Sequence, residues 1–511
     1  MAVGLHLPTA ATVPTLTPLL QPLQQPVQFR DLGHIDPVRS CARMSTSPAP
    51  TPLRADFQGA MPSSLVMASL SRALDLAEGE PMGHALRSCW LGMKLGDWVG
   101  LGPQERQELF YALLLKDAGC SANAYSVTHW FGADDRSTKA RLKIADWSSQ
   151  WKSVLFAIRQ TAPAAPITRK MAQLVSLGSK GPGLASELVQ VRCTRGAELV
   201  RELGWGEPAA EAVLCLDEHW NGSGRPRGLK GEEIPLLSRI ILLSQTAEIF
   251  WRLGGRRSVE SVLRRRRGTW FDPQLVDAVL VHARGDKLWD RFATITHPEQ
   301  VAHLDPHPRR VPTATLAEML KIGQVFAGVV DAKSPWTATH STRTALLSRR
   351  MAAVMGLDEE EADRICLAAL LQDLGKLAIS NSILDKAGPM DPAEVMEMQA
   401  HTEISYQLLA PLWPLGDVAE MAASHHERLD GSGYHRHLRG PDLTFGAQIV
   451  AVADVFEALT SDRPYRRALD HDQAIARLRK EAGRSLAAEP ISALFEMVES
   501  ARSMAEGAAI D

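Results

Sequence analysis

The chain has 511 residues, of which 45% are hydrophobic and 23% charged, with a formal net charge of −3. This length and composition exclude a fully disordered or fibrous chain and predict several domains, while the small charge gives no overall attraction to nucleic acid or to an anionic membrane. The six cysteines occur singly, which favours reduced thiols, and no apolar stretch approaches the roughly 20 residues of a membrane span, so we expect a cytoplasmic protein that binds neither nucleic acid nor membranes.

Residues 1–61 differ in composition from the rest of the chain. They are rich in Pro, Thr, Ala, Gln and Ser, as in PTAATVPTLTPLLQPLQQP, and they lack the basic start and apolar block of a signal peptide. Closely spaced prolines prevent long helices. We predict a disordered N-terminal extension.

From about residue 62 onward, apolar residues recur at steps of three and four, as in QERQELFYALLLKDAG and EEADRICLAALLQDLGK. This periodicity is typical of amphipathic helices and predicts an all-α protein. The chain also repeats itself, because FYALLLKDAG and a later NGSG segment have counterparts in LAALLQDLGK and DGSG. We therefore predict two tandem helical domains, at 62–305 and 310–505, joined by the Pro-rich segment near 307–313.

The second half contains histidines and aspartates in segments that are predicted to be helical or to end a helix: His340, Asp373, His401, His425, His426 and Asp454. Neutral imidazole and carboxylate oxygen suit Zn, Fe and Mn, and one carboxylate can bridge two ions. A single histidine in a helical protein is more often at the surface or satisfied in the core. Six such residues in motif-like surroundings favour a metal site.

These segments resemble the HD-GYP domain, a branch of the HD phosphohydrolase superfamily. The resemblance rests on LLQDLGKLAISNSIL, HTEISYQLL, SHHERLDGSGYHRHLRG and VADVFEALTSDRPYRR, and extends to 62–300 as a diverged copy. It implies an all-α fold, a metal centre, and hydrolysis of cyclic di-GMP or a related cyclic dinucleotide. We expect two divalent ions, with Fe or Mn favoured over Mg, Ni or Zn.

The resemblance also assigns roles by position. The implied metal ligands are His340, Gln372, Asp373, His401, His425, His426 and Asp454. Asp373, which bridges two metals in the family, and Lys376, which touches the scissile phosphate, are the implied catalytic residues. The implied substrate-binding residues are Gly433, Tyr434, Arg463 and Arg466. From the residues alone, Lys376 could equally close a helix C-terminus, and the two arginines could form a solvated helix start.

Three positions depart from the family pattern. Gln372 stands where the family has a histidine, and a glutamine carbonyl is a weaker ligand than imidazole for borderline metals. His435 replaces the proline of the Gly-Tyr-Pro signature, and Thr402 replaces the proline of a His-Pro pair. The leading prediction is therefore a metal-dependent phosphodiesterase. The alternative is a weak or inactive HD-GYP protein that serves as a nucleotide receptor or protein-interaction module.

The first half retains fewer of these residues. His84 and Asp117 persist, but the remaining ligand positions hold Lys116, Arg192, Leu216, Asp217 and Gln245. We predict that this half binds no metal and instead packs against the second half, binds a regulator or forms a homodimer surface. An arginine cluster at 256–267 is interpreted as a solvated helix face rather than a nucleic-acid contact.

Overall fold

The computed structural model describes residues 61–144, 158–163, 166–179, 183–284, 287–306, 313–412, 415–434 and 436–507. The predicted extension at 1–61, apart from Met61, lies outside the described residues, and so does most of the predicted joint near 307–313. The described residues belong to one compact unit. The predicted domain boundaries stay a prediction.

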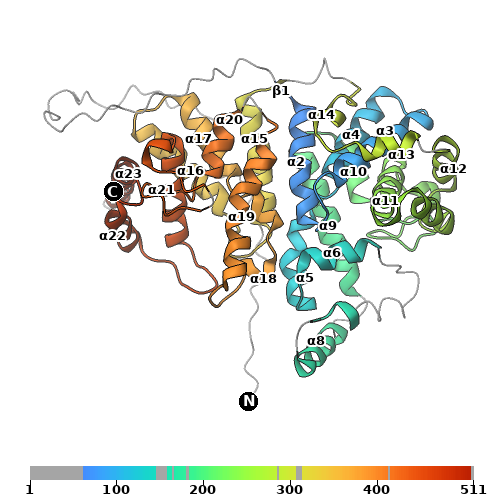
Figure 1. The fold of residues 1–511 in the computed structure, drawn as a ribbon, viewed down its shortest axis with the longest axis horizontal. Helices are drawn as coiled ribbons and strands as arrows, with labels where there is room; N and C mark the ends of the chain where they lie inside the picture. Colours follow the sequence, from blue (N-terminus) through green and yellow to red (C-terminus); the bar gives the residue numbers. More distant parts are fainter. Residues whose placement is uncertain are drawn as a thin grey trace. The chain divides into compact units, whose positions relative to one another are not determined.

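The first half is built from helices, which run from blue to yellow-green in Figure 1. Their bounds are α2 (Ser63–Ala77), α3 (His84–Trp98), α4 (Pro103–Leu115), η2 (Cys120–Asn123), α5 (Ala124–Phe131), α6 (Asp135–Ile144), α8 (Ile167–Ser179), α9 (Gly183–Glu202), α10 (Glu207–Leu214), η3 (Gly231–Glu233), α11 (Leu236–Arg266), α12 (Pro273–His282), α13 (Lys287–Ala293) and α14 (Glu299–Ala302). The long α11 consists of two helices that meet at a kink at Gly254 and Gly255.

The second half is also helical, and it runs from yellow to red in Figure 1. Its elements are β2 (Thr313–Ala314), α15 (Leu316–Asp331), α16 (His340–Val354), α17 (Glu359–Leu371), η4 (Leu374–Ala378), α18 (Asn381–Leu384), α19 (Pro392–Leu409), α20 (Gly416–Ala423), η6 (Gly440–Asp442), α21 (Phe445–Thr460), α22 (His471–Glu481) and α23 (Ala488–Gly507). Within the described residues, the one sheet pairs β2 with β1 (Met61–Pro62) in antiparallel register. The structure confirms the all-α prediction.

Local sequence fixes where the helices around the second-half cluster begin. The Asp358 carboxylate accepts a hydrogen bond from the Glu361 N–H at the start of α17. The Asp391 carboxylate caps α19, and Thr444 caps α21, in the same way. Each cap satisfies a backbone donor that has no partner within its helix. The three helices are thereby held at defined starting points.

One hydrophobic core extends through both halves and includes residues of α2, α3, α4, α11, α16, α17 and α21. Burial of this apolar surface is the main force that holds the helices together. The described cysteines are all free thiols, and four of the five are buried, in agreement with the prediction. Among the described helices, none has both the length and the apolar character needed to cross a membrane.

Candidate metal centre

The predicted ligands come from five helical segments of the second half. His340 is the first residue of α16, Gln372 and Asp373 follow directly after α17, and His401 lies in α19. His425 and His426 follow α20, while Asp454 lies in α21. Helix ends and the buried faces of two helices, α19 and α21, therefore bring residues that are far apart in sequence to a common place.

Asp373 lies at the centre of these side chains. Its Oδ2 is 3.3 Å from His340 Nε2. Its Oδ1 is 3.4 Å from His401 Nε2 and 3.7 Å from His425 Nε2. The two carboxylate oxygens thus face different imidazoles, which is the arrangement that a carboxylate shared between two ions requires.

Asp454 forms the second carboxylate of the cluster. Its Oδ1 is 3.1 Å from His340 Nε2 and accepts a hydrogen bond of 3.3 Å from Gln372 Nε2. Its Oδ2 is 3.9 Å from His426 Nδ1. The structure therefore brings all seven predicted ligand residues together, including the glutamine that departs from the family pattern.

Backbone carbonyl groups fix the tautomer of two of the histidines. His401 Nδ1 is 2.6 Å from the Met398 carbonyl oxygen, and His425 Nδ1 is 2.6 Å from the Ala422 carbonyl oxygen. Because a carbonyl only accepts, each Nδ1 carries the hydrogen and each Nε2 presents a lone pair. The two Nε2 atoms are 3.4 Å apart, and both histidines belong with His426 to a group whose ligand atoms lie within 4.8 Å of one another.

Glu457, which the sequence analysis did not identify, orients His340. Its carboxylate contacts His340 Nδ1 and also accepts a hydrogen bond of 2.6 Å from Ser461 Oγ. Both Glu457 and His340 are buried. A carboxylate on the far nitrogen fixes the imidazole tautomer and raises its basicity as a ligand. The signal was present in the sequence, because Glu248 stands in the same relation to Gln245 as Glu457 does to Asp454.

We expect Glu457→Gln to weaken metal affinity by about 10–100-fold, because an amide orients and polarises the His340 imidazole less strongly than a carboxylate. Metal titration of purified protein measures the effect. Glu496→Gln, an exposed position on α23, is the matched control and should bind metal as the wild type does. Equal affinities in the two variants would contradict the role given to Glu457.

Lys376 lies next to the shared carboxylate. Its Nζ is 2.6 Å from Asp373 Oδ2, within the short helix η4. Ser405 Oγ of α19 donates to the Gln372 carbonyl and accepts from the Gly375 N–H. A Cβ at Gly375 would lie 1.9 Å from the His401 carbonyl oxygen. Only glycine allows this close approach, which fixes η4 against α19.

Except at His340, the ionisation of the cluster suits cation binding. Burial lowers the pKa of the His340 imidazole, but its contacts with Asp373, Asp454 and Glu457 outweigh burial and hold that pKa well above the usual range, so His340 must release a proton to bind a cation. Burial opposes ionisation of Asp373, but Lys376 and His340 outweigh it and hold the pKa of its carboxyl well below the usual range. Burial lowers the pKa of His401 to about 3 and also lowers the pKa of His425 and of His426. These three imidazoles are therefore neutral near pH 7 and do not need to release a proton before they bind a cation.

Two buried atoms in the cluster have no hydrogen-bond partner, namely Asp373 Oδ1 and Gln372 Oε1. An unpartnered buried oxygen is costly, so such atoms call for a ligand or an ion. The donors are imidazole nitrogen and carboxylate or amide oxygen, a set that suits Mn, Fe or Zn and not a soft thiolate-binding metal. The residues present therefore fit a divalent metal centre.

The glycine loop lies beside the histidines. The Tyr434 ring centroid is 4.4 Å from that of His426, while a Cβ at Gly433 would lie 2.5 Å from the Glu427 Cα. The Glu427 carboxylate accepts hydrogen bonds from the backbone N–H groups of Arg436 and Leu438. The loop is thus tied to the segment that carries the paired histidines. His435 lies outside the described residues.

The two predicted substrate-binding arginines have different surroundings. Arg463 Nη2 is 3.3 Å from Glu457 Oε2, next to the ligand cluster. Arg466 instead donates to the backbone carbonyls of Ala458, Leu459 and Arg467, which closes the C-terminal end of α21. Arg463 is therefore the better placed of the two to meet an anionic substrate.

The first half retains two features of the ligand cluster, namely a contact between a histidine and a glutamate and the spacing between this histidine and an aspartate. His84 Nδ1 is 2.5 Å from Glu248 Oε2, which parallels the contact between His340 and Glu457. The same interval separates His84 from Asp117 and His340 from Asp373.

In the first half, lysine ammonium groups lie beside Asp117, the counterpart of Asp373. Lys116 contacts the carboxylate of Asp117, and Lys143 Nζ lies 3.0 Å from Asp117 Oδ1 and 3.1 Å from Glu78 Oε2. Glu78, Asp117 and Cys120 lie close enough together to hold an ion. Lys143, however, already pairs with both carboxylates, and Lys116 supplies a second positive charge beside Asp117.

A glycine identifies the residue that replaces His401. A Cβ at Gly119 would lie 1.9 Å from the Arg192 carbonyl oxygen, just as one at Gly375 would lie 1.9 Å from that of His401. Arg192 also contacts the carboxylate of Asp217. Basic side chains therefore stand where the second half has ligands. That this half binds no metal stays a prediction, for which these cations give a physical reason.

Much of the arginine cluster at 256–267 is paired within the protein. Arg256 and Arg264 contact Glu260, and Arg267 contacts Asp277. The Arg266 guanidinium lies 3.7 Å from the centroid of the Trp270 ring. These contacts agree with the interpretation of a structural, largely solvated helix face.

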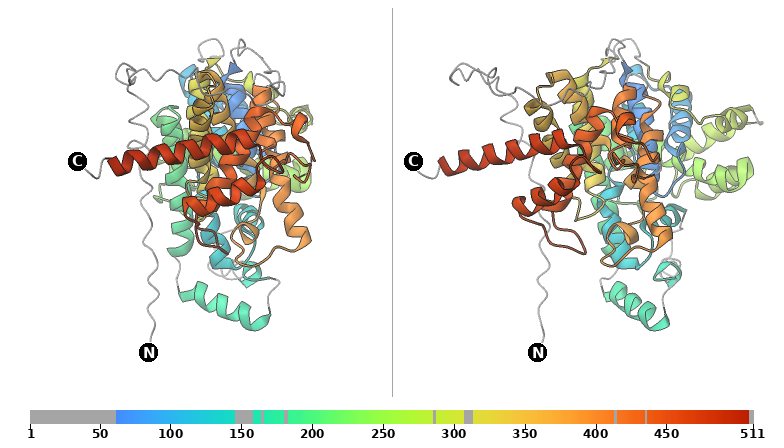
Figure 2. Two further views of the ribbon diagram at one scale, coloured as in Figure 1. Left: turned by 90° about the vertical axis from the view of Figure 1, so that its left-hand side faces the viewer. Right: turned by 60° about the vertical axis from the view of Figure 1, so that its left-hand side comes forward.

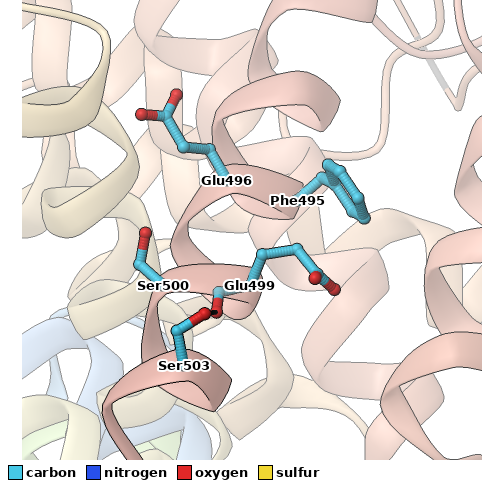
Figure 3. A pocket seen from close by; sticks show the side chains of 5 residues that line it. All are labelled: Phe495, Glu496, Glu499, Ser500 and Ser503. Atoms are coloured by element: carbon cyan, nitrogen blue, oxygen red, sulfur yellow. Dashed lines mark hydrogen bonds between the residues drawn. The ribbon is translucent and has the colours of Figure 1, made fainter. Parts of the chain in front are cut away.

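A surface hollow on α23 contains none of the predicted site residues. It is lined by Phe495, Glu496, Glu499, Ser500 and Ser503, which all belong to this one helix (Figure 3). In Figure 2, α23 extends as a long helix toward the C-terminus. The hollow has no imidazole or cation with which to hold a metal or a phosphate. The predicted ligands lie in the buried cluster instead.

Comparison with known proteins identifies relatives that share most of this chain. A family model described as HD domain matches residues 173–275 and 324–488. The 3′3′-cGAMP-specific phosphodiesterase 3 of Vibrio cholerae serotype O1 is 39% identical over 442 residues, which are 86% of this chain and 95% of that protein. The 3′3′-cGAMP-specific phosphodiesterase 1 of the same organism is 30% identical over 308 residues, 57% of this chain and 70% of that one.

A solved structure agrees with these matches. The crystal structure of a cyclic GMP-AMP specific phosphodiesterase of V. cholerae, V-cGAP3, has a TM-score of 0.61 and 35% sequence identity to this chain. The match covers 86% of this chain and 98% of that one. Both halves of the present chain therefore have counterparts in one solved protein.

Proposed function

Because the chain belongs to the HD-GYP branch of the HD-domain family, we propose that its second half hydrolyses 3′3′-cGAMP at a centre of two divalent metal ions. Metal-dependent hydrolysis of a cyclic dinucleotide is the activity of this group of phosphodiesterases. The choice of 3′3′-cGAMP is supported by the relatives that share most of the chain's length. The observation that carries the assignment is Asp373, whose buried carboxylate faces three imidazole Nε2 atoms.

The ligand roles follow from the contacts. His340, Asp373 and Asp454 would hold one ion, with the Gln372 amide as a fourth donor. Asp373 with His401, His425 and His426 would hold the other. Two ions, with Fe or Mn favoured over Mg, Ni or Zn, would supply hydroxide at neutral pH and neutralise phosphoryl charge. Asp373 belongs to both ligand sets and would therefore hold the two ions next to each other.

Protein side chains contribute the rest of the site. Lys376, beside Asp373, presents a compact positive charge to the phosphoryl group, where negative charge develops during hydrolysis. Tyr434 offers an aromatic face beside His426, and Arg463 a guanidinium beside the cluster, for the base and phosphate of the nucleotide. Gly433 fixes the loop that carries Tyr434. The first half would serve as a contact for a second copy or a partner protein.

Gln372→His is expected to raise metal affinity by about tenfold, because imidazole is a stronger ligand than an amide oxygen for Mn, Fe or Zn. Metal titration of the two proteins measures the change. A matched control is Gln473→His at the exposed start of α22, which should leave the affinity unchanged. If Gln372→His binds metal more weakly than the wild type, the glutamine is not a weakened ligand.

The substrate assignment is tested by comparing kcat/KM for 3′3′-cGAMP and cyclic di-GMP, with the linear products separated by chromatography. The full chain, purified anaerobically and loaded with Mn²⁺ or Fe²⁺, should prefer 3′3′-cGAMP. A higher kcat/KM for cyclic di-GMP would overturn the choice of nucleotide and leave the reaction class intact. Tight nucleotide binding without turnover, in protein that retains metal, would instead indicate a receptor.

A further inference from the structure

The N-terminal end of α6, in the first half, contacts the chain segment that follows Lys376 in the second half. The Asp135 carboxylate accepts a hydrogen bond of 3.0 Å from the Asn381 N–H through Oδ1. The next residue, Arg136, donates to the Ala378 carbonyl oxygen. Two adjacent residues of one half therefore hold both ends of the turn that connects η4 to α18 in the other.

A buried ion pair also connects the two halves at this contact. Asp135 Oδ2 is 3.2 Å from Lys333 Nζ, and both side chains are almost fully buried. Asn381 Nδ2 in turn donates to the Lys333 carbonyl oxygen at 2.6 Å. A buried ammonium that loses its carboxylate is strongly destabilising. The second half thus relies on the first for the counter-ion of Lys333 and for the acceptor of the Asn381 N–H.

The clamped turn lies at the end of the segment that carries the catalytic candidates. Asp373 and Lys376 begin this segment, and Ser405 of α19 holds its first end through Gln372 and Gly375. Asp135 and Arg136 hold its last end. The short helix η4 is therefore fixed from both sides, by its own half at one end and by the first half at the other.

We propose that Asp135 and Arg136 are positioning residues, through which the first half fixes η4 and thereby sets Lys376 and Asp373 for catalysis. The proposal rests on the proposed function, since it takes Lys376 and Asp373 as the groups that act on the nucleotide. It gives the first half a role that needs no metal. A small displacement of a catalytic group can cost on the order of 100-fold in rate.

Two double variants separate positioning from simple burial of charge. In both, Lys333→Met removes one of the two buried ammonium groups beside Asp135, because an apolar side chain can replace a buried ion pair with little loss of stability. The other ammonium, Lys139, lies 3.5 Å from Asp135 Oδ2, donates to the carbonyl oxygens of Ala77 and Cys120, and is present in both variants. Asp135→Asn keeps a carbonyl oxygen for the Asn381 N–H, whereas Asp135→Ala removes it. The readouts, on the full chain, are the thermal unfolding midpoint, kcat and KM for 3′3′-cGAMP, and hydrogen exchange of the amides in 374–385.

We expect Asp135→Ala/Lys333→Met to lower kcat by about tenfold or more relative to Asp135→Asn/Lys333→Met, with KM within about twofold. Amide exchange in 374–385 should be about tenfold faster in the alanine variant. Equal kcat and equal exchange in the two variants would overturn the proposal. A fall in the unfolding midpoint with unchanged kcat would show a purely structural contact and would overturn it as well.

If the double variants do not fold, Arg136→Ala provides a second test. Arg136 is only partly buried, so the fold should tolerate its replacement. It should lower kcat and speed exchange in the same segment, whereas the exposed neighbour Ser137→Ala should do neither. Wild-type kcat and exchange in Arg136→Ala would overturn the proposal. If the wild type itself shows no turnover, the proposed function fails. Hydrogen exchange then tests the clamp by itself, and unchanged exchange overturns it.

Discussion

Asp373→Asn is expected to lower kcat for 3′3′-cGAMP by at least about 1000-fold and to reduce the metal content of the purified protein. The carboxylate faces His340 through one oxygen and His401 and His425 through the other. An amide removes the one negative charge that both ion positions share, and it leaves only the Asp454 carboxylate among the proposed ligands to attract the metals. Elemental analysis and a turnover assay measure the two effects.

Asp363→Asn is the matched control for this variant. Asp363 lies on α17, ten positions before Asp373, and its carboxylate pairs with Arg349 away from the cluster. Metal content and turnover should match the wild type. Wild-type turnover in Asp373→Asn would show that the metal centre has been assigned to the wrong residues.

Lys376→Met is expected to lower kcat by about 100–1000-fold, the cost of losing one preorganised group that stabilises transition-state charge. Metal should be retained, because an ammonium is not a ligand. Its Nζ lies 2.6 Å from Asp373 Oδ2, so methionine fills the space without offering charge. Single-turnover kinetics and metal analysis separate the two effects.

Lys386→Met provides the comparison for Lys376. Lys386 pairs with Glu394 near the protein surface, and its replacement should leave kcat unchanged. If Lys376→Met loses its metal, the lysine supports the centre structurally. If it keeps both metal and wild-type kcat, the catalytic role is wrong.

The sequence predicted the helical fold because its apolar periodicity of three and four is the property that buries a helix face. Six of the seven clustered ligand residues were predicted because six histidines and aspartates in motif-like segments of one half favour a metal site, and Gln372 was added from the resemblance to the HD-GYP domain. Glu457 was missed, since one acidic residue in VFEALT reads as an exposed helix position. Its burial against His340 arises only from the packing of α21 on α16.

The contacts between the halves could not be predicted from local sequence. Asp135 begins a helix, where an acidic residue is ordinarily explained by the positive end of the helix dipole. Its contacts with Lys333 and Asn381 bring together segments that no shared motif connects. The resemblance to the HD-GYP domain implies a substrate-binding role for Arg466, which stays a prediction, and local sequence did not indicate that its guanidinium would also satisfy carbonyls at the end of α21.

We infer that the second half alone holds a catalytic centre of two metal ions. The most direct test is to titrate metal-free protein anaerobically with Mn²⁺ or Fe²⁺ and to follow 3′3′-cGAMP hydrolysis at each step. Turnover should rise with added metal and reach a plateau at about two equivalents per chain, and Asp373→Asn should bind less metal than the wild type. Full turnover in the chelated protein, or bound metal that Asp373→Asn leaves unchanged, would contradict the account.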